Sequence, residues 1–206
     1  GLAATLKKKH NAQVYLILRD IFPQNAVDLG FMKSESFIHK FFSKKEKKLY
    51  DTADSIGCMS QANIDYIRNS NEVATDKLHI LRNWQYLNED YVVEVDAIRK
   101  EYEILNKFVV VFGGNMGKPQ QLEYVIELAI KCKVHQDIVF VLLGEGVMME
   151  KIKIVAEQKN IQNIRFHESI PKMEYQSLLK AAQVGLISLN ENFTIPNIPS
   201  KALDYW

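Results

Sequence analysis

The segment Phe108-Val109-Val110-Val111-Phe112-Gly113-Gly114 is an uninterrupted apolar run that ends in two glycines. Such runs are typical of strands in a parallel sheet that is covered on both faces, because neither face of the strand then meets water. The glycines allow a sharp turn and also allow a ligand to approach the backbone closely. The segment therefore predicts a buried parallel strand whose carboxyl end is a candidate ligand-binding edge.

Apolar runs of this kind alternate with helical patterns along the chain. We expect strands at residues 14–18, 55–59, 77–81, 108–112, 138–143, 164–166 and 184–189. We expect helices at 34–50, 93–105, 120–132 and 172–181. A further helix should follow the cap Ser60 and run through 67, another should follow Gly146 and run through 155, and a last one should begin at about Ser200. This alternation predicts an α/β fold with Rossmann-like parallel sheets flanked by helices. The pattern breaks between about 82 and 106, which predicts a connection between two domains.

Composition excludes several classes of protein. The chain has 206 residues, of which 47% are hydrophobic, and its 26 basic and 25 acidic residues nearly balance. This balance argues against a dedicated nucleic-acid-binding protein, which would usually be basic. No stretch approaches the roughly 20 apolar residues needed to cross a bilayer. Cys58 and Cys132 fit a reducing compartment and are best interpreted as small buried hydrophobic residues.

Both ends of the chain read as interrupted. Gly1 opens directly into helix-like sequence without an initiator methionine, and Trp206 closes a helix-like stretch that has no cap or breaker after it. We therefore expect the chain to be a slice of a longer protein.

The loop Gly113-Gly114-Asn115-Met116-Gly117-Lys118 could bind an anion, because it follows a strand, precedes an expected helix and contains a cation. Its spacing matches neither a P-loop nor a dinucleotide fingerprint. A plain tight turn explains the loop equally well. For Gly144-Glu145-Gly146, at the next strand end, the plain turn is the preferred interpretation.

A second candidate anion site is Pro199-Ser200-Lys201. Proline and serine are typical of a helix start, where a lysine is mildly unfavourable unless an anion compensates its charge. Asp204 lies one helical turn after Ser200 and could accept hydrogen bonds from ribose hydroxyls. It could equally be an ordinary acid of a first helical turn.

Two further features have a plain and a functional interpretation. His167 could be a base or a ligand, but a lone histidine at a strand end is more often structural. The expected helix 34–50 has Phe37, Phe41 and Phe42 on one side and a lysine-rich side opposite. Its basic tract, Lys44, Lys45, Lys47 and Lys48, is best read as a solvated face, with a membrane-surface role as the second interpretation. We find no metal-ligand cluster and no nucleophile triad in the sequence.

Taken together, these segments resemble the family-4 (group 1) retaining glycosyltransferases of the GT-B fold, in the branch that builds bacterial surface polysaccharides such as capsule and O-antigen. The resemblance rests on the order and spacing of segments 110–120, 140–146, 163–172 and 199–205. Upstream, Arg19-Asp20-Ile21-Phe22-Pro23 and Ser60 resemble the late part of that family's acceptor domain, and Asn83 resembles an asparagine near its interdomain crossing.

The resemblance implies a partial two-domain enzyme. Residues 1–83 would be the latter part of the acceptor-side domain, 84–106 the connection, and 107–206 an incomplete nucleotide-sugar-binding domain. The implied reaction moves a sugar, with retention, from a UDP- or GDP-sugar to a saccharide or lipid-linked acceptor. No cofactor or metal is expected. The implied location is cytoplasmic, with peripheral contact at the inner membrane.

The resemblance also implies residue roles. Lys118, Asn115 and Asp204 would form the catalytic set, and the donor would be bound by Gly113, Gly114, Ile170, Ser200 and Lys201. Within this set Gly114, Asn115 and Lys118 would meet the diphosphate together with Ser200 and Lys201. The backbone around Ile170 would meet the base, and Asp204 the ribose. The chain departs from the family pattern at Asn115 and Gln120, where arginine and lysine are commoner, at Pro196, in place of a glutamate, and at Arg19, roughly where a histidine is frequent.

Two alternatives stay open at this stage. The departures at Asn115, Gln120 and Pro196 fit a binding or scaffolding domain that kept the fold and lost catalysis. A UDP-sugar epimerase shares the architecture, but the sequence offers no acid or base set for it.

Overall fold

The computed structural model describes residues 1–85 and 93–205, which form two compact units. Unit 1 comprises residues 1–84 and 192–198, and unit 2 comprises the described residues of 85–191 and 199–205. Part of the expected interdomain connection, residues 86–92, lies outside the described residues. The acceptor-side and donor-side roles of the two halves stay predictions.

Unit 1 is built on a three-stranded parallel sheet in the order β1-β2-β3. Its strands are β1 (Tyr15–Leu18), β2 (Ser55–Cys58) and β3 (Leu78–Ile80). Its helices are α1 (Leu2–His10), α2 (Gln24–Asp28), α3 (Phe37–Thr52), α4 (Gln61–Asn71) and the 3₁₀ turn η1 (Thr75–Lys77). Cys58 is buried in the core, as expected. The expected cap is confirmed, because Ser60 Oγ accepts a hydrogen bond from the Asn63 amide at 3.2 Å.

A segment from late in the chain completes unit 1. The Thr194 amide donates to Asp28 Oδ2 at 2.8 Å, and the buried Asn63 side chain donates to the Pro196 carbonyl at 3.0 Å. Ile195 is buried in the core of this unit. Residues 192–198 therefore belong to unit 1, although their neighbours on both sides belong to unit 2.

Unit 2 is built on a four-stranded parallel sheet in the order β6-β5-β4-β7. Its strands are β4 (Phe108–Gly113), β5 (Ile138–Leu143), β6 (Ile164–His167) and β7 (Val184–Gly185). The expected strand at 184–189 is wrong in length. After Gly185 one further bond, from the Leu186 amide to the Val111 carbonyl, continues the pairing at 2.7 Å. Asn190 then donates to the Pro119 carbonyl at 2.8 Å, so the chain leaves the sheet for the loop after β4.

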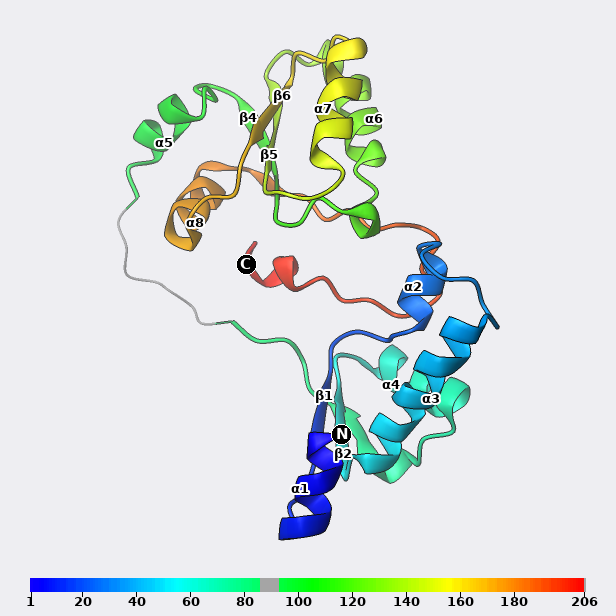
Figure 1. Ribbon diagram of the computed structural model, residues 1–206. Helices are drawn as coiled ribbons and strands as arrows, with labels where there is room; N and C mark the ends of the chain where they lie inside the picture. Colours follow the sequence, from blue (N-terminus) through cyan, green and yellow to red (C-terminus); the bar gives the residue numbers. More distant parts are fainter. Residues whose placement is uncertain (86–92, 206) are drawn as a thin grey trace. The chain divides into compact units, whose positions relative to one another are not determined.

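Helices cover both faces of this sheet (Figure 1). Alternate strand residues, such as Val110 and Phe112, pack in one core with α6 (Glu123–Lys131) and α7 (Met149–Gln158). The intervening residues, such as Val109 and Val111, pack in a second core with α5 (Val95–Glu101) and α8 (Lys172–Ala181). This arrangement explains the uninterrupted apolar run, because neither face of β4 meets water after Phe108. The expected α/β class with parallel sheets flanked by helices is confirmed.

Two expected helix starts are wrong. The helix expected at 120–132 is α6, which begins only at Glu123 because the 3₁₀ turn η2 (Lys118–Gln120) stands before it. A second 3₁₀ turn, η3 (Cys132–Val134), follows α6. The expected helix from Ser200 is the 3₁₀ turn η4 (Ser200–Leu203). Its bonds span three residues, from the Ala202 amide to the Pro199 carbonyl and from the Asp204 amide to the Lys201 carbonyl. A single 3₁₀ turn lacks the aligned dipoles of an α-helix, so the expected dipole contribution at Ser200 is absent.

The lysine tract of α3 is exposed, as expected, but two of the phenylalanines expected on the opposite side are exposed as well. Phe37 and Phe41 are 86% and 49% exposed, whereas Tyr50 is buried and its hydroxyl donates to the half-buried Glu46 at 2.9 Å. Burial raises the pKa of the Glu46 carboxyl. The helical period explains the outcome, because Glu46 and Tyr50 are four residues apart and point inward, which turns Phe37 and Phe41 outward.

None of the helices within residues 1–85 and 93–205 is long and apolar enough to span a bilayer.

Replacing Gly144 with alanine should destabilise the protein by roughly 2–4 kcal/mol. Gly144 has φ +140°, and a Cβ there would overlap the Gly114 carbonyl oxygen. Urea unfolding of G144A would measure the loss. The matched control is G30A, which has φ +72° but open space around the new methyl and should cost only about 1–2 kcal/mol. Equal losses in the two variants would contradict the proposed steric overlap.

Candidate functional site

The candidate site lies at the carboxyl edge of the unit 2 sheet, where the loops after β4 and β5 are joined by backbone hydrogen bonds. The Gly114 amide donates to the Leu143 carbonyl at 2.9 Å, and the Met116 amide donates to the Glu145 carbonyl at 2.8 Å. The segment Gly144-Glu145-Gly146 therefore forms a turn that supports the loop of residues 113–118, which we call the first glycine loop.

Most amide groups of the first glycine loop are already used within the protein. Besides Gly114 and Met116, the Gly117 amide donates to Gln120 Oε1 at 3.0 Å. Within the described part of the chain, no group accepts a hydrogen bond from the Asn115 amide. The amides of Gly114, Met116 and Gly117 are thus engaged within the protein, the Asn115 amide is not engaged by any described residue, and Gln120 stabilises the loop.

Lys201 comes to this edge from the 3₁₀ turn η4. Its Nζ lies 3.7 Å from the centroid of the Phe112 ring, and a side chain on Gly114 would begin 3.9 Å from the same Nζ. The Nζ atom is buried and has no hydrogen-bond partner among the residues that the structure describes. Burial lowers the pKa of Lys201 to about 8, and the nearby Asp204 carboxylate opposes this shift in part.

A buried ammonium without a hydrogen-bond acceptor is costly in free energy. The Phe112 ring offers a cation–π contact, which offsets only part of that cost. An anion placed beside Gly114 would supply the missing acceptors and the missing charge. The arrangement is therefore one that an anion could complete.

The structure places the other expected site residues as follows. Asp204 lies beside Lys201 on the same turn, while Ser200 and Lys118 are exposed at the starts of η4 and η2.

The exposed Asn115 side chain lies against Gly117 and Gly146, and half-buried Ile170 packs on the second core. Gly113 is buried beneath the Tyr175 ring. Gly114, Lys201 and Asp204 are thus brought together, whereas Ile170 is engaged in packing.

Two tyrosines at this edge were missed by sequence reasoning. The Tyr175 ring packs directly on Gly113, and the Tyr205 ring packs on Gly185. The Tyr205 hydroxyl donates to the Leu186 carbonyl at 3.0 Å, which holds η4 against the end of β7. A glycine at each strand end was the only available signal, because the rings come from distant parts of the chain.

In unit 1 the structure joins two residues that the sequence singled out separately. Arg19 follows β1 and donates through Nε and Nη2 to Asn83 Oδ1 at 3.1 and 2.5 Å. The Arg19 guanidinium also lies 5.6 Å from the centre of the Trp84 ring. Because both residues follow the carboxyl ends of parallel strands, their meeting could have been anticipated.

His167 has a structural setting. Its ring packs edge-on against Tyr102 with centroids 4.8 Å apart, and burial lowers its pKa, which favours the neutral imidazole. Its Nε2 is buried without a hydrogen-bond partner among the described residues.

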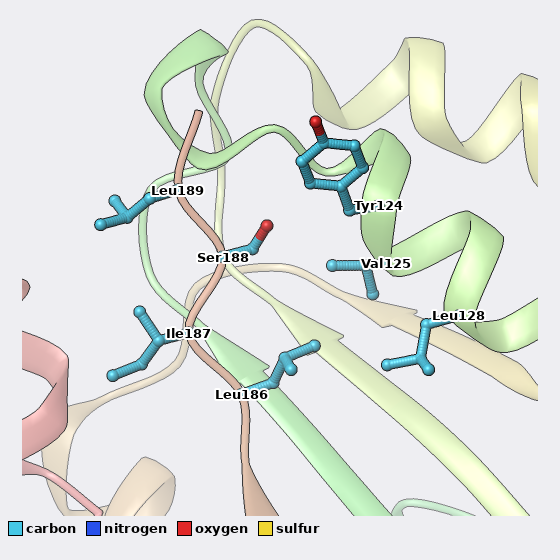
Figure 2. A pocket seen from close by; sticks show the side chains of 7 residues that line it. All are labelled: Tyr124, Val125, Leu128, Leu186, Ile187, Ser188 and Leu189. Atoms are coloured by element: carbon cyan, nitrogen blue, oxygen red, sulfur yellow. The ribbon is translucent and has the colours of Figure 1, made fainter. Parts of the chain in front are cut away.

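A cavity of about 270 Å³ opens beside α6 (Figure 2). Its lining is apolar except for hydroxyl groups, and consists of Tyr124, Val125, Leu128, Leu186, Ile187, Ser188 and Leu189. Without a cation in its lining, this cavity does not suit a diphosphate.

Within residues 1–85 and 93–205, no three histidine, cysteine, aspartate or glutamate side chains are grouped so as to hold a metal ion.

No family model matches the chain. The "Probable glycosyltransferase WbjE" of Pseudomonas aeruginosa is 24% identical over 193 residues, which cover 91% of this chain and 47% of WbjE. The chain is homologous to GT-B glycosyltransferases of the group 1 type. Escherichia coli (strain K12) WcaI, named as a colanic acid biosynthesis glycosyl transferase, is 27% identical over 136 residues, or 63% of this chain and 32% of WcaI.

Solved GT-B structures show the same fold. Anabaena HepE in complex with UDP and glucose superposes with a TM-score of 0.71 at 13% identity, covering 91% of this chain and 49% of HepE. WaaG, a glycosyltransferase involved in lipopolysaccharide biosynthesis, gives a TM-score of 0.68 at 13% identity, covering 98% of this chain and 59% of WaaG. The chain thus spans half or less of the curated relatives it matches.

Replacing Lys201 with methionine should stabilise the protein at pH 7. The variant keeps an apolar chain against Phe112 and removes a buried charge. After allowance for partial exposure, the gain is on the order of 2 kcal/mol. The ordinary lysine pKa is 10.5, so between pH 8 and 10.5 the folded protein binds fewer protons at Lys201 than the unfolded chain does. Wild-type stability therefore rises relative to the variant as pH increases, and the gap closes.

Chemical denaturation of K201M and wild type at pH 7 and pH 10 would measure this gap. A variant that is less stable at pH 7, or a gap that does not change with pH, would contradict the burial of a charged Lys201.

Proposed function

We propose that unit 2 binds the diphosphate of a nucleotide-sugar and that the protein acts as a retaining glycosyltransferase in polysaccharide biosynthesis. The observation that carries this proposal is the buried Lys201 ammonium, which lacks a hydrogen-bond acceptor among the described residues and lies beside Gly114. A diphosphate supplies both the charge and the acceptor oxygens that this ammonium lacks.

Each site residue takes a role that follows from its position. Lys201 holds the diphosphate and stabilises the negative charge that develops as the sugar leaves. Lys118 is exposed on the same glycine loop and adds a second cation, while the Asn115 amide donates a hydrogen bond. Asp204 accepts hydrogen bonds from the ribose, and Ser200 contributes its hydroxyl to a phosphate oxygen.

The remaining donor contacts use backbone rather than side chain. The absence of side chains at Gly113 and Gly114 leaves room for the diphosphate, and the backbone at Ile170 meets the base while its side chain stays packed on the second core. Stabilisation of the leaving group then depends on cations and amides of the protein and needs no metal ion.

The comparisons favour UDP over GDP as the nucleotide of the sugar donor. HepE has been solved with UDP-glucose, at a TM-score of 0.69 and 12% identity, as well as with UDP and glucose. WcaI and WaaG are named for colanic acid and lipopolysaccharide biosynthesis. A saccharide or lipid-linked acceptor in capsule or O-antigen assembly, used at the cytoplasmic face of the membrane, fits these relatives.

Calorimetric titration with UDP tests the proposal directly. Wild type should bind UDP, and K201M should bind it roughly tenfold to a hundredfold more weakly, because a charge-assisted hydrogen bond is lost. Uridine lacks the diphosphate, so its affinity should be the same for both proteins. A titration with GDP would compare the two bases.

The matched control is K159M. It removes the same charge from the exposed residue that ends α7, at the amino edge of the sheet, and should change UDP affinity by less than about twofold. Equal UDP affinity for wild type and K201M would refute the assigned site. If folded wild type bound no nucleoside diphosphate at all, the non-catalytic scaffold would become the better explanation.

A further inference from the structure

Arg19 and Asn83 join the two outer strands of the unit 1 sheet at its carboxyl edge. Arg19 follows β1 and Asn83 follows β3, and these strands pair on either side of β2. Neighbouring strands lie about 4.8 Å apart, so roughly 10 Å separates β1 from β3 and the two side chains meet across the end of β2. Because Nε and Nη2 of Arg19 both donate to Asn83 Oδ1, the plane of the guanidinium is held in one orientation.

The charge of Arg19 has no acidic partner among the described residues, since no carboxylate there forms an ion pair with it. A guanidinium carries five N–H donors, and the neutral Asn83 oxygen accepts from two of them. The other three belong to an exposed side chain. An oriented arginine is well suited to a carboxylate or a phosphate group, because its planar fork of donors matches their oxygens.

Trp84 places an exposed aromatic surface beside this guanidinium. Its side chain is 60% exposed, although the Arg19 guanidinium lies 5.6 Å from the centre of its ring. A hydrogen-bonded bridge between strand ends explains Arg19 and Asn83, but it does not require a tryptophan in water. The flat indole ring can cover the C–H face of a pyranose, whose hydroxyl groups then stay free to form hydrogen bonds.

A sugar ring with an anionic substituent uses both side chains at once. We propose that the carboxyl edge of unit 1 binds an acidic saccharide, with its ring against Trp84 and its carboxylate or phosphate group on Arg19. The role of this saccharide as the acceptor in sugar transfer rests on the proposed function. Its binding does not, because all the residues involved belong to unit 1 and none contacts the nucleotide.

Ligand-observed NMR tests the proposal with three sugars that differ at C6. Glucuronate, glucose 6-phosphate and glucose share a pyranose ring, and only the first two carry an anion. Without UDP, wild type should bind at least one acidic sugar about tenfold more tightly than glucose, because Arg19 adds charge-assisted hydrogen bonds. The acid that binds more tightly identifies the anion as a carboxylate or a phosphate.

Two substitutions separate the contributions of the two side chains. R19Q should lower the affinity for the acidic sugar to that for glucose and leave the affinity for glucose unchanged, and R19K should restore only part of the difference because it lacks the planar fork. W84A should weaken the binding of acidic and neutral sugars alike, by about fivefold, since the ring contact does not depend on C6. An arginine that only bridges the strands would instead affect all three sugars equally.

Three control variants match these changes. R68Q removes an exposed arginine from the last turn of α4, and F108A removes a 43% exposed ring from the start of β4 in unit 2. Both should bind all three sugars as wild type does, and circular dichroism would verify that each variant is folded. K201M should also bind them as wild type does. Loss of the acidic sugar in K201M, with R19Q unaffected, would place that sugar at the nucleotide site and overturn the proposal.

The indole N–H signal of Trp84 locates the bound sugar. In ¹⁵N-labelled protein this signal is assigned by its absence from W84A, and it should shift as the acidic sugar is added. Equal affinity of wild type for all three sugars, a preference for acid that survives in R19Q, or a Trp84 signal that does not move would each overturn the proposal. Titration of the same sample with UDP tests the nucleotide site separately, so either assignment can fail while the other stands.

Discussion

The pairing of β4 with β5, buried on both faces and closed at its carboxyl end, is the constraint on which unit 2 depends. The two strands stay in register over six residues and then continue into loops that bond each other through their backbones. The Gly114 carbonyl occupies the space where a Gly144 side chain would be, so this close approach of the two loops requires glycine at position 144. The backbone hydrogen bonds between the loops form within the protein itself, so the edge that would receive a donor does not depend on a ligand for its shape.

The burial of the Lys201 ammonium at this edge lowers the stability of the folded protein. Its ammonium lies against Phe112 without a hydrogen-bond acceptor among the described residues, and its pKa is lowered by burial. Proteins commonly accept such strain at functional sites and offset it elsewhere. Here the Tyr205 hydroxyl and the ring contact with Gly185 hold η4, the turn that carries Lys201, against the end of β7.

Late in its course the chain passes from unit 2 into unit 1 and back within a short stretch. Residues 192–198 are fastened within unit 1 by Thr194, Ile195 and the Pro196 carbonyl, and the chain then enters η4 directly. Pro196 stands where the resembled family often has a glutamate, and in this chain its carbonyl accepts the hydrogen bond of the buried Asn63. The departure thus coincides with a structural contact of unit 1, which no local pattern could reveal.

Sequence reasoning identified the strands, the cap at Ser60, the α/β class and the glycine loops, because these depend on local periodicity and on turn chemistry. It failed where packing decides, as in the length of β7 and the 3₁₀ turn at Ser200. The order of residues alone establishes which segments are apolar on both faces, since hydrophobic period is a local property. The burial of the Lys201 ammonium beside Gly114 arises only on folding, because it requires Phe112 and Tyr205, which lie far apart along the chain.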